Sequence, residues 1–222
     1  MMLFEGGIEG RENGTLILAC AFALYYAVML HTPPRLVRSV VKTLAVGLLA
    51  LLAVLTGGPI LLAAALFLSA VGDYFLSVEG ERPFLAGLAS FLVAHIVYVV
   101  LFAGMGGGFA VFGAESWRTA LAVAIVVYAF AMLWLLMRRI GPELRLPVAA
   151  YVAAIVAMGV TALGMHQPAV TVGALMFMAS DSLLATERFL LSAISPHRVW
   201  MRYAVWGLYF AGQLLITLGL VL

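Results

Sequence analysis

Two aspartates, Asp73 in SAVGDYFLS and Asp181 in FMASDSLLA, lie inside long apolar runs. A carboxylate near the centre of a membrane helix costs about 2.5–3.5 kcal/mol to insert, so acids in such places are usually functional. Two carboxylates that meet in a cavity of low dielectric constant cannot both ionise easily, so one keeps its proton. The pair then offers a general acid and an anion, the combination that cleaves glycosides through a cation. Asp73 and Asp181 are therefore the candidate catalytic residues.

The composition indicates an integral membrane protein. Hydrophobic residues make up 65% of the 222 and charged residues only 10%, against about 45–50% and 25% in soluble domains. A net charge of +2, with the basic residues scattered among short connections, argues against a nucleic-acid partner. The single cysteine, Cys20, excludes an intrachain disulfide. The first fourteen residues lack the basic start of a signal peptide, so we expect the first span to be retained.

Cutting the apolar runs at glycine, proline and charge clusters gives eight pieces, each near the roughly 20 residues that a transmembrane helix needs. We predict an all-α, polytopic fold of eight transmembrane helices in one domain over residues 1–222, after a short N-terminal segment over 1–14. The predicted spans are 15–31, 39–56, 59–78, 84–104, 118–137, 146–163, 168–187 and 200–221. The connections are short, so no soluble domain is expected between the spans.

The positions of lysine and arginine predict the orientation. Ten of the 12 fall in or beside the connections after spans 1, 3, 5 and 7, and the other two fall on the opposite side. Basic connections stay in the cytoplasm, so both termini are expected on the outer side. We predict a multi-pass protein of the bacterial inner membrane with its active site open toward the cytoplasm.

The two aspartates are expected at one depth. Asp73 lies six residues before Glu79 and Asp181 six before Glu187, which places each about 9 Å inside the inner boundary of the membrane. Their surroundings are similar and they are 108 residues apart, which suggests a 4+4 internal repeat. We expect both side chains to face one polar cavity.

Other polar side chains within the predicted spans would surround this cavity. His95 shares a helix face with Tyr98, and Tyr209 shares one with Gln213. The full set of supporting or proton-relaying candidates is His95, Ser69, Ser180, Tyr98, Tyr151, Tyr209 and Gln213. Each also has a structural interpretation, because tyrosine and glutamine join membrane helices and a lone histidine is often a packed one.

Three segments carry a resemblance to a known family: SAVGDYFLSVEGERPFLAGLASFLVAHIVYV, GALMFMASDSLLATERF and WGLYFAGQLLI. Together they resemble the YhhN-like membrane family, which includes the lysoplasmalogenases. Its most specific parts here are Gly72-Asp73, the ladder Phe84, Gly87, Phe91, His95 and Tyr98, then Ser180-Asp181 with Phe189, and Tyr209 with Gln213. The resemblance implies eight helices and hydrolysis of the vinyl ether bond of lysoplasmalogens, with Asp73 and Asp181 at the family's acidic positions.

The candidate residues suit that reaction. A vinyl ether is cleaved by a proton delivered to its outer alkene carbon, which gives an oxocarbenium ion that water then attacks. The protonated aspartate would supply the proton and the ionised one would stabilise the cation and activate water. His95 could orient a carboxylate or relay the proton. Lys42, with Arg35 or Arg38, could receive the lipid phosphate, although Lys42 could also extend to lipid headgroups. The expected partners are a lysophospholipid and the bilayer, with no cofactor and no metal.

Three other functions stay open at this point. Asp73, Asp181 and His95 could hold a divalent ion in a metal-dependent lipid hydrolase, although no HExxH-like spacing accompanies them. Intramembrane aspartates also carry protons in transporters built from repeats. The third is a lipid-binding protein without activity. Aldehyde release, chelator sensitivity and solute uptake under a pH gradient would separate these functions.

Overall fold

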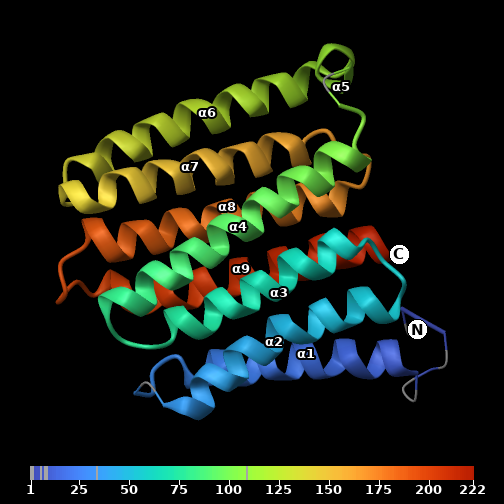
Figure 1. Ribbon diagram of the computed structural model, residues 1–222, viewed down its shortest axis with the longest axis horizontal. Helices are drawn as coiled ribbons and strands as arrows, with labels where there is room; N and C mark the ends of the chain where they lie inside the picture. Colours follow the sequence, from blue (N-terminus) through green and yellow to red (C-terminus); the bar gives the residue numbers. More distant parts are fainter. Residues whose placement is uncertain (1–2, 6, 8–9, 34, 109) are drawn as a thin grey trace. The chain divides into compact units, whose positions relative to one another are not determined.

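The structure is a computed structural model that describes residues 3–5, 7, 10–33, 35–108 and 110–222 (Figure 1). Within these ranges every regular element is helical. The helices are α1 (Arg11–Met29), α2 (Leu36–Leu55), α3 (Ile60–Leu76), α4 (Glu81–Met105), α5 (Ala110–Ala114), α6 (Ser116–Met137), α7 (Pro142–Ala162), α8 (Pro168–Ala185), the π-helix η2 (Thr186–Leu190) and α9 (His197–Val221). Each predicted span coincides with one long helix, with ends that differ by up to four residues.

Three features differ from the prediction. The first helix begins at Arg11, inside the N-terminal segment predicted over 1–14, of which residues 1–2, 6 and 8–9 lie outside the described ranges. The short helix α5 lies in the glycine-rich connection, where no helix was predicted. The apolar run that ends near Glu187 continues to Leu190 as a π-helix.

Seven described helices are long and apolar enough to cross a membrane, namely α1, α2, α4, α6, α7, α8 with its π-helical end, and α9. The helix α3 is also apolar but has 17 residues, which places it at the short limit for a span. The protein is therefore an integral, multi-pass membrane protein.

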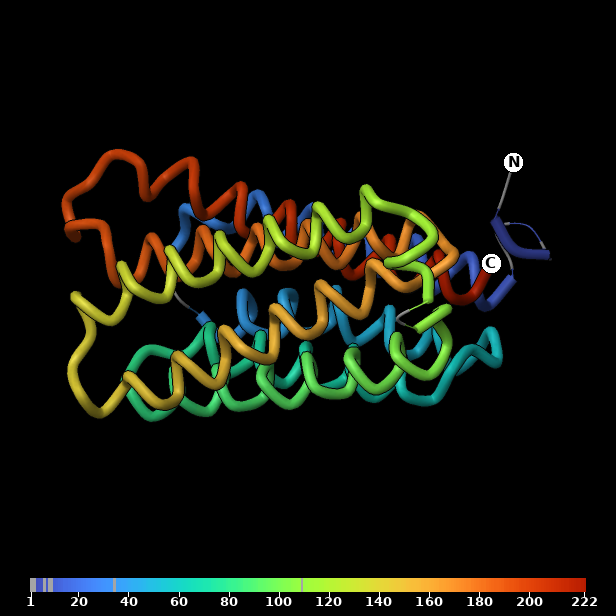
Figure 2. Tube along the Cα trace, turned by 90° about the horizontal axis from the view of Figure 1, so that it is seen from above, coloured from blue at the N-terminus to red at the C-terminus, as the bar shows by residue number. Residues whose placement is uncertain are grey.

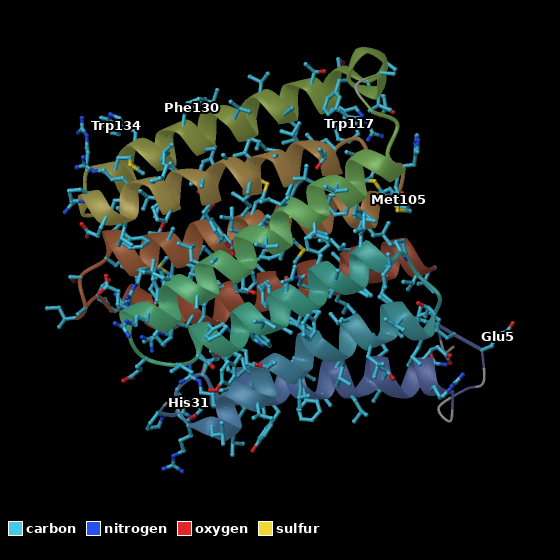
Figure 3. The ribbon with its side chains drawn as sticks, viewed as in Figure 1. Glu5, His31, Met105, Trp117, Phe130 and Trp134 are labelled. Carbon is cyan, nitrogen blue, oxygen red and sulfur yellow. The ribbon has the colours of Figure 1, made fainter. Side chains whose placement is uncertain are left out.

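Exposed aromatic residues on α6 support this assignment. Figure 3 shows Trp117 and Trp134 toward opposite ends of α6, with Phe130 between them. All three side chains are exposed. The two tryptophans are 17 residues apart, or about 25 Å along a helix, close to the thickness of the hydrocarbon core, and tryptophan concentrates at both membrane interfaces.

The chain divides into two compact units, which are described in turn. The first unit contains residues 1–98 and 217–222, and the second contains residues 99–216. The predicted organisation as a single domain stays a prediction.

In the first unit, α1 packs along α2, and α2 packs along α3 (Figure 1). Small residues allow the close approach, since Ala19, Ala45 and Ala53 are fully buried. The helices α3 and α4 approach even more closely: a Cβ added at Gly72 would lie 2.6 Å from the ring of Phe91. Asp73 is therefore positioned on a helix that has neighbours on two sides.

In the second unit, α6 and α7 pack together, and α7 packs along α8. Figure 2 shows the tight reversal of the chain, in yellow, that joins α6 to α7. Leu136, Ile140 and Val148 form a buried cluster at this reversal. At the other end of the pair, the guanidinium of Arg118 at the start of α6 donates to the carbonyl oxygens of Leu163 and Met165 at the end of α7. These contacts fix the register of α7, which carries Tyr151.

Candidate active site

In the first unit, Asp73 forms an ion pair with Lys42. Lys42 is on α2 and Asp73 is on α3, and the distance from Lys42 Nζ to Asp73 Oδ1 is 2.9 Å. The side chain of Asp73 is 1% exposed and that of Lys42 is 14% exposed. A buried ion pair keeps both partners charged, because neutralising one leaves the other charge buried and uncompensated. The contact therefore favours Asp73 as an anion.

A tyrosine that was not among the predicted site residues lies beside Lys42. Tyr26, buried on α1, has its ring centroid 5.9 Å from Lys42 Nζ and 5.6 Å from the guanidinium carbon of Arg38. These distances are within the range of cation–π attraction. Arg38 also donates from Nη1 to the carbonyl oxygen of Thr32 at 2.7 Å, which stabilises the connection between α1 and α2. Arg35, which precedes α2, is exposed.

The contacts between α3 and α4 set the level of His95. A Cβ at Gly72 would meet Phe91, and a Cβ at Gly87 would lie 2.8 Å from Leu76. These pairs define an antiparallel register in which His95 is level with residue 68. His95 therefore lies about 7.5 Å along the helix axis from the level of Asp73.

The remaining candidates in the first unit are buried. His95, Tyr98 and Ser69 are all inaccessible to solvent. The Ser69 hydroxyl donates to the carbonyl oxygen of Ala65, one turn earlier in its own helix, at 2.9 Å. Their roles in proton transfer stay predictions.

In the second unit, Asp181 accepts a hydrogen bond from Tyr151. The Tyr151 hydroxyl on α7 donates to Oδ2 of Asp181 on α8 at 2.6 Å, and both residues are half-buried. A phenol is a neutral donor, so the bond persists whether or not the second carboxyl oxygen carries a proton. The partner of Asp181 thus tolerates both of its protonation states.

The helix α9 packs antiparallel to α8 beside this group. The hydroxyl of Ser180 donates to the carbonyl oxygen of Val205 at 2.9 Å, and a Cβ at Gly173 would lie 2.6 Å from the carbonyl oxygen of Gly212. In this register Tyr209 is level with residue 176, about 7.5 Å along the axis from Asp181. Its ring contacts that of Phe177 edge to face, with centroids 5.2 Å apart. The other candidate on α9, Gln213, is fully buried one turn further along.

The structure thus joins Lys42 to Asp73, and Tyr151 to Asp181. Asp73 belongs to the first unit and Asp181 to the second, and their convergence in one cavity stays a prediction. Within the described part of each unit, no group of three or more histidine, cysteine, aspartate or glutamate side chains is placed to hold a metal ion.

A further charged group was not predicted. Glu187, in the π-helix, is buried and forms ion pairs with Arg198 and Arg202 near the start of α9. A sequence signal existed, because the two arginines are four residues apart and share a helix face. Glu187 itself was interpreted only as the charged end of a span.

Comparison with known proteins gives the following similarities. The sequence model of the YhhN family matches residues 37–220. A protein named lysoplasmalogenase from Mycobacterium bovis is 33% identical over 162 residues, which cover 71% of this chain and 59% of the relative. Human lysoplasmalogenase TMEM86B is 35% identical over 159 residues, which cover 72% of this chain and 62% of the relative. The pig protein of the same name is 32% identical over 158 residues, which cover 71% and 62% of the two chains.

These alignments leave part of each relative unmatched. The chain matches roughly three fifths of the length of the curated relatives. No solved structure matches it significantly.

Proposed function

The chain belongs to the YhhN family, and from this premise we propose that it hydrolyses the vinyl ether bond of a lysoplasmalogen. The products are a fatty aldehyde and a glycerophospho-alcohol such as glycerophosphoethanolamine or glycerophosphocholine. The names of the relatives from Mycobacterium bovis and human support this substrate class. The observation that carries the proposal is that each intramembrane aspartate contacts a polar side chain of a neighbouring helix. Asp73 contacts a lysine ammonium, and Asp181 contacts a tyrosine hydroxyl.

The reaction consumes one water molecule. A carboxylic acid donates its proton to the outer alkene carbon, and the electrons of the double bond form the new C–H bond. The adjacent carbon becomes an oxocarbenium ion, and a water molecule that loses a proton adds to it. The resulting hemiacetal breaks its bond to the glycerol oxygen, which takes up a proton, and releases the aldehyde. The proton lost by the attacking water goes to the ionised carboxylate and from there restores the acid, and the hemiacetal hydroxyl supplies the proton that the glycerol oxygen takes up.

The partners of the two aspartates suggest how the roles divide. Lys42 favours the ionised form of Asp73, so we assign Asp73 to stabilise the oxocarbenium ion and to accept the proton of the attacking water. Tyr151 is a neutral donor, so its hydrogen bond to Asp181 is compatible with a protonated carboxyl group, and we assign Asp181 as the general acid. In this assignment Lys42 acts through Asp73 and is a positioning residue.

This chemistry requires that the two units bring Asp73 and Asp181 to one substrate molecule. We propose that α3 is an eighth span, that the two termini lie on the outer side, and that the halves form a 4+4 repeat. The contacts within each half support the repeat: Lys42 and Tyr151 are 109 residues apart, their aspartate partners are 108 apart, and each contact joins equivalent helices. The excess of basic residues after alternate spans supports the orientation and a site open toward the cytoplasm of a bacterial inner membrane.

The test uses the purified protein in vesicles of a saturated phosphatidylcholine. It is incubated with a lysoplasmalogen or with the matched ester lysolipid, and aldehyde and fatty acid are measured separately. We expect aldehyde from the vinyl ether and no fatty acid from the ester, with or without a chelator. Loss of activity in the chelator would indicate a metal-dependent hydrolase, and no aldehyde from a folded protein would reject the proposal.

A further inference from the structure

The second unit contains a buried carboxylate held by two arginines. Glu187 lies in the π-helical end of α8, and its side chain is 9% exposed. Its Oε1 atom lies 3.4 Å from Arg198 Nη2 and 3.0 Å from Arg202 Nε. Burying a carboxylate is costly unless it is paired and hydrogen-bonded, and the two arginines supply this pairing. The same ion pairs hold the two arginine side chains in place.

The two arginines make different contacts. Arg198 is 22% exposed and also donates from Nη1 to the carbonyl oxygen of Glu187 at 2.9 Å, so it joins α9 to the end of α8. The side chain of Arg202 is 51% exposed and contacts Glu187 through Nε. This geometry leaves the two terminal amino groups of Arg202 available to an outside ligand. Glu187 thus fixes the direction of a half-exposed guanidinium.

The charge of the cluster favours an anion. Two guanidinium groups surround one carboxylate, so the three side chains carry one net positive charge. A guanidinium presents its donors in a planar fork that matches two oxygens of a phosphate. Arg202, held by Glu187, has the chemistry of a phosphate-binding side chain.

We propose that Arg202 binds the phosphate of the lysolipid headgroup and that Glu187 is its positioning residue. This inference rests on the proposed function. It differs from the expectation that Lys42 binds the phosphate, because the ammonium of Lys42 contacts Asp73.

The spacing along the helix agrees with the size of the substrate. Glu187 follows Asp181 by six residues, or about 9 Å of helix. Seven covalent bonds separate the outer alkene carbon, which Asp181 would protonate, from phosphorus in a lysoplasmalogen, about 8 Å when extended. Arg202 can therefore hold the phosphate while Asp181 reaches the alkene. The expected result is a preference for substrates that carry the phosphate.

The test compares two substrates, a lysoplasmalogen and the corresponding 1-alkenylglycerol, which has the same vinyl ether and no phosphate. The quantity measured is the ratio of kcat/KM for the two, in vesicles of neutral phosphatidylcholine. In R202Q we expect this ratio to fall by about ten-fold or more, mainly through KM for the lysoplasmalogen. R202K, which keeps the charge and loses the fork, should recover part of the ratio, and E187Q should lower it.

The matched control is R139Q, which removes an exposed arginine from the same unit without a known role and should leave the ratio unchanged. An unchanged ratio in R202Q would overturn the inference, as would equal losses on both substrates, which indicate a purely structural cluster. The phosphate of bulk lipid is the other source of this chemistry. A bulk-lipid role would show as wild-type activity that rises with added phosphatidylglycerol and as loss of this rise in R202Q. If R202Q lost the rise but kept the substrate ratio of the wild type, the inference would also be overturned. If the wild-type protein cleaves neither substrate, the proposed function fails first.

Discussion

The two aspartates lie in different units and contact side chains of different character. Asp73, on α3, contacts a cation from α2, and it is almost completely buried. Asp181, on α8, contacts a phenol from α7, and it is half-buried. The same residue type on the same kind of helix is thus given one environment that fixes a negative charge and another that permits a proton.

This difference shows that the side chain contributed by the neighbouring helix, more than the aspartate itself, determines which protonation states the contact allows. An ion pair buried in a membrane helix bundle is stable only while both charges persist. A hydrogen bond from a phenol does not require a charged partner, because a phenol can donate to a carboxyl group that is either ionised or protonated. In the proposed mechanism, an acid and an anion therefore arise from two identical side chains, as they do in enzymes with paired carboxylates.

The largest effect is expected when the proposed acid is removed. Asp181→Asn keeps the shape and the acceptor for Tyr151 but has no proton to give, so aldehyde release should fall by about 10²–10⁴-fold. Thermal unfolding in detergent should change less than in D73N, because Asn still accepts the hydrogen bond from Tyr151. Activity within a few-fold of the wild type would exclude Asp181 as the acid.

Asp73→Asn should reduce activity to a similar extent and should also destabilise the protein. It leaves the ammonium of Lys42 buried without its counter-charge, which costs about 3–5 kcal/mol of unfolding free energy. The double variant D73N/K42M should regain most of that stability and none of the activity. Equal stability of D73N and the wild type would contradict the role of the ion pair.

A smaller effect is expected for Tyr151→Phe, which removes the hydroxyl that contacts Asp181. The lost hydrogen bond is worth about 1 kcal/mol, so kcat should fall by up to about ten-fold with little change in KM. Tyr128→Phe on α6, an exposed tyrosine of the same unit, is the matched control and should be silent. A loss as large as that of D181N would mean that Tyr151 itself transfers the proton.

The smallest effect concerns the pH dependence of stability outside the aspartate groups. The hydrogen bonds from Arg118 and then Trp117 hold the pKa of Glu115 below its ordinary value of 4.5. Since the pKa is lower in the folded state, the contribution of Glu115 is complete above pH 4.5 and is lost as the pH falls through the folded value. Glu115 is exposed, so the effect is small.

Glu115→Gln should therefore lower thermal stability slightly above about pH 4.5, should match the wild type once the pH falls below the folded pKa of Glu115, and should leave the pH profile of activity unchanged. If E115Q and the wild type have the same pH profile of activity, the pH dependence of activity arises from groups other than Glu115. A shifted activity profile in E115Q would contradict this separation.

The helices could be predicted because a membrane span has a simple sequence signature, a long apolar run that ends at glycine, proline or charge. The aspartates could be recognised for the same reason, as charges where the pattern requires apolar residues. The short α5 and the π-helix carry no such signature. The π-helix contains Glu187, whose contacts with α9 depend on a neighbour distant in sequence.

The partners of the aspartates could not be assigned from sequence. A contact between two helices depends on their register and rotation, which the apolar pattern of a membrane protein barely encodes. Tyr25 and Tyr26 illustrate this, since they are identical neighbours in the chain and one is exposed while the other is buried beside Lys42. Lys42 was predicted to bind phosphate from its expected depth, and its contact with Asp73 has no signature in the sequence. The phosphate role of Lys42 stays a prediction.

Infrared spectroscopy of the reconstituted protein at neutral pH tests the division of roles most directly, because a protonated carboxyl group has a carbonyl absorption that a carboxylate lacks. We expect one such absorption in the wild type, absent from D181N and retained in D73N. An absorption lost in D73N and retained in D181N would reverse the roles, and an active enzyme without any protonated carboxyl group would contradict the account.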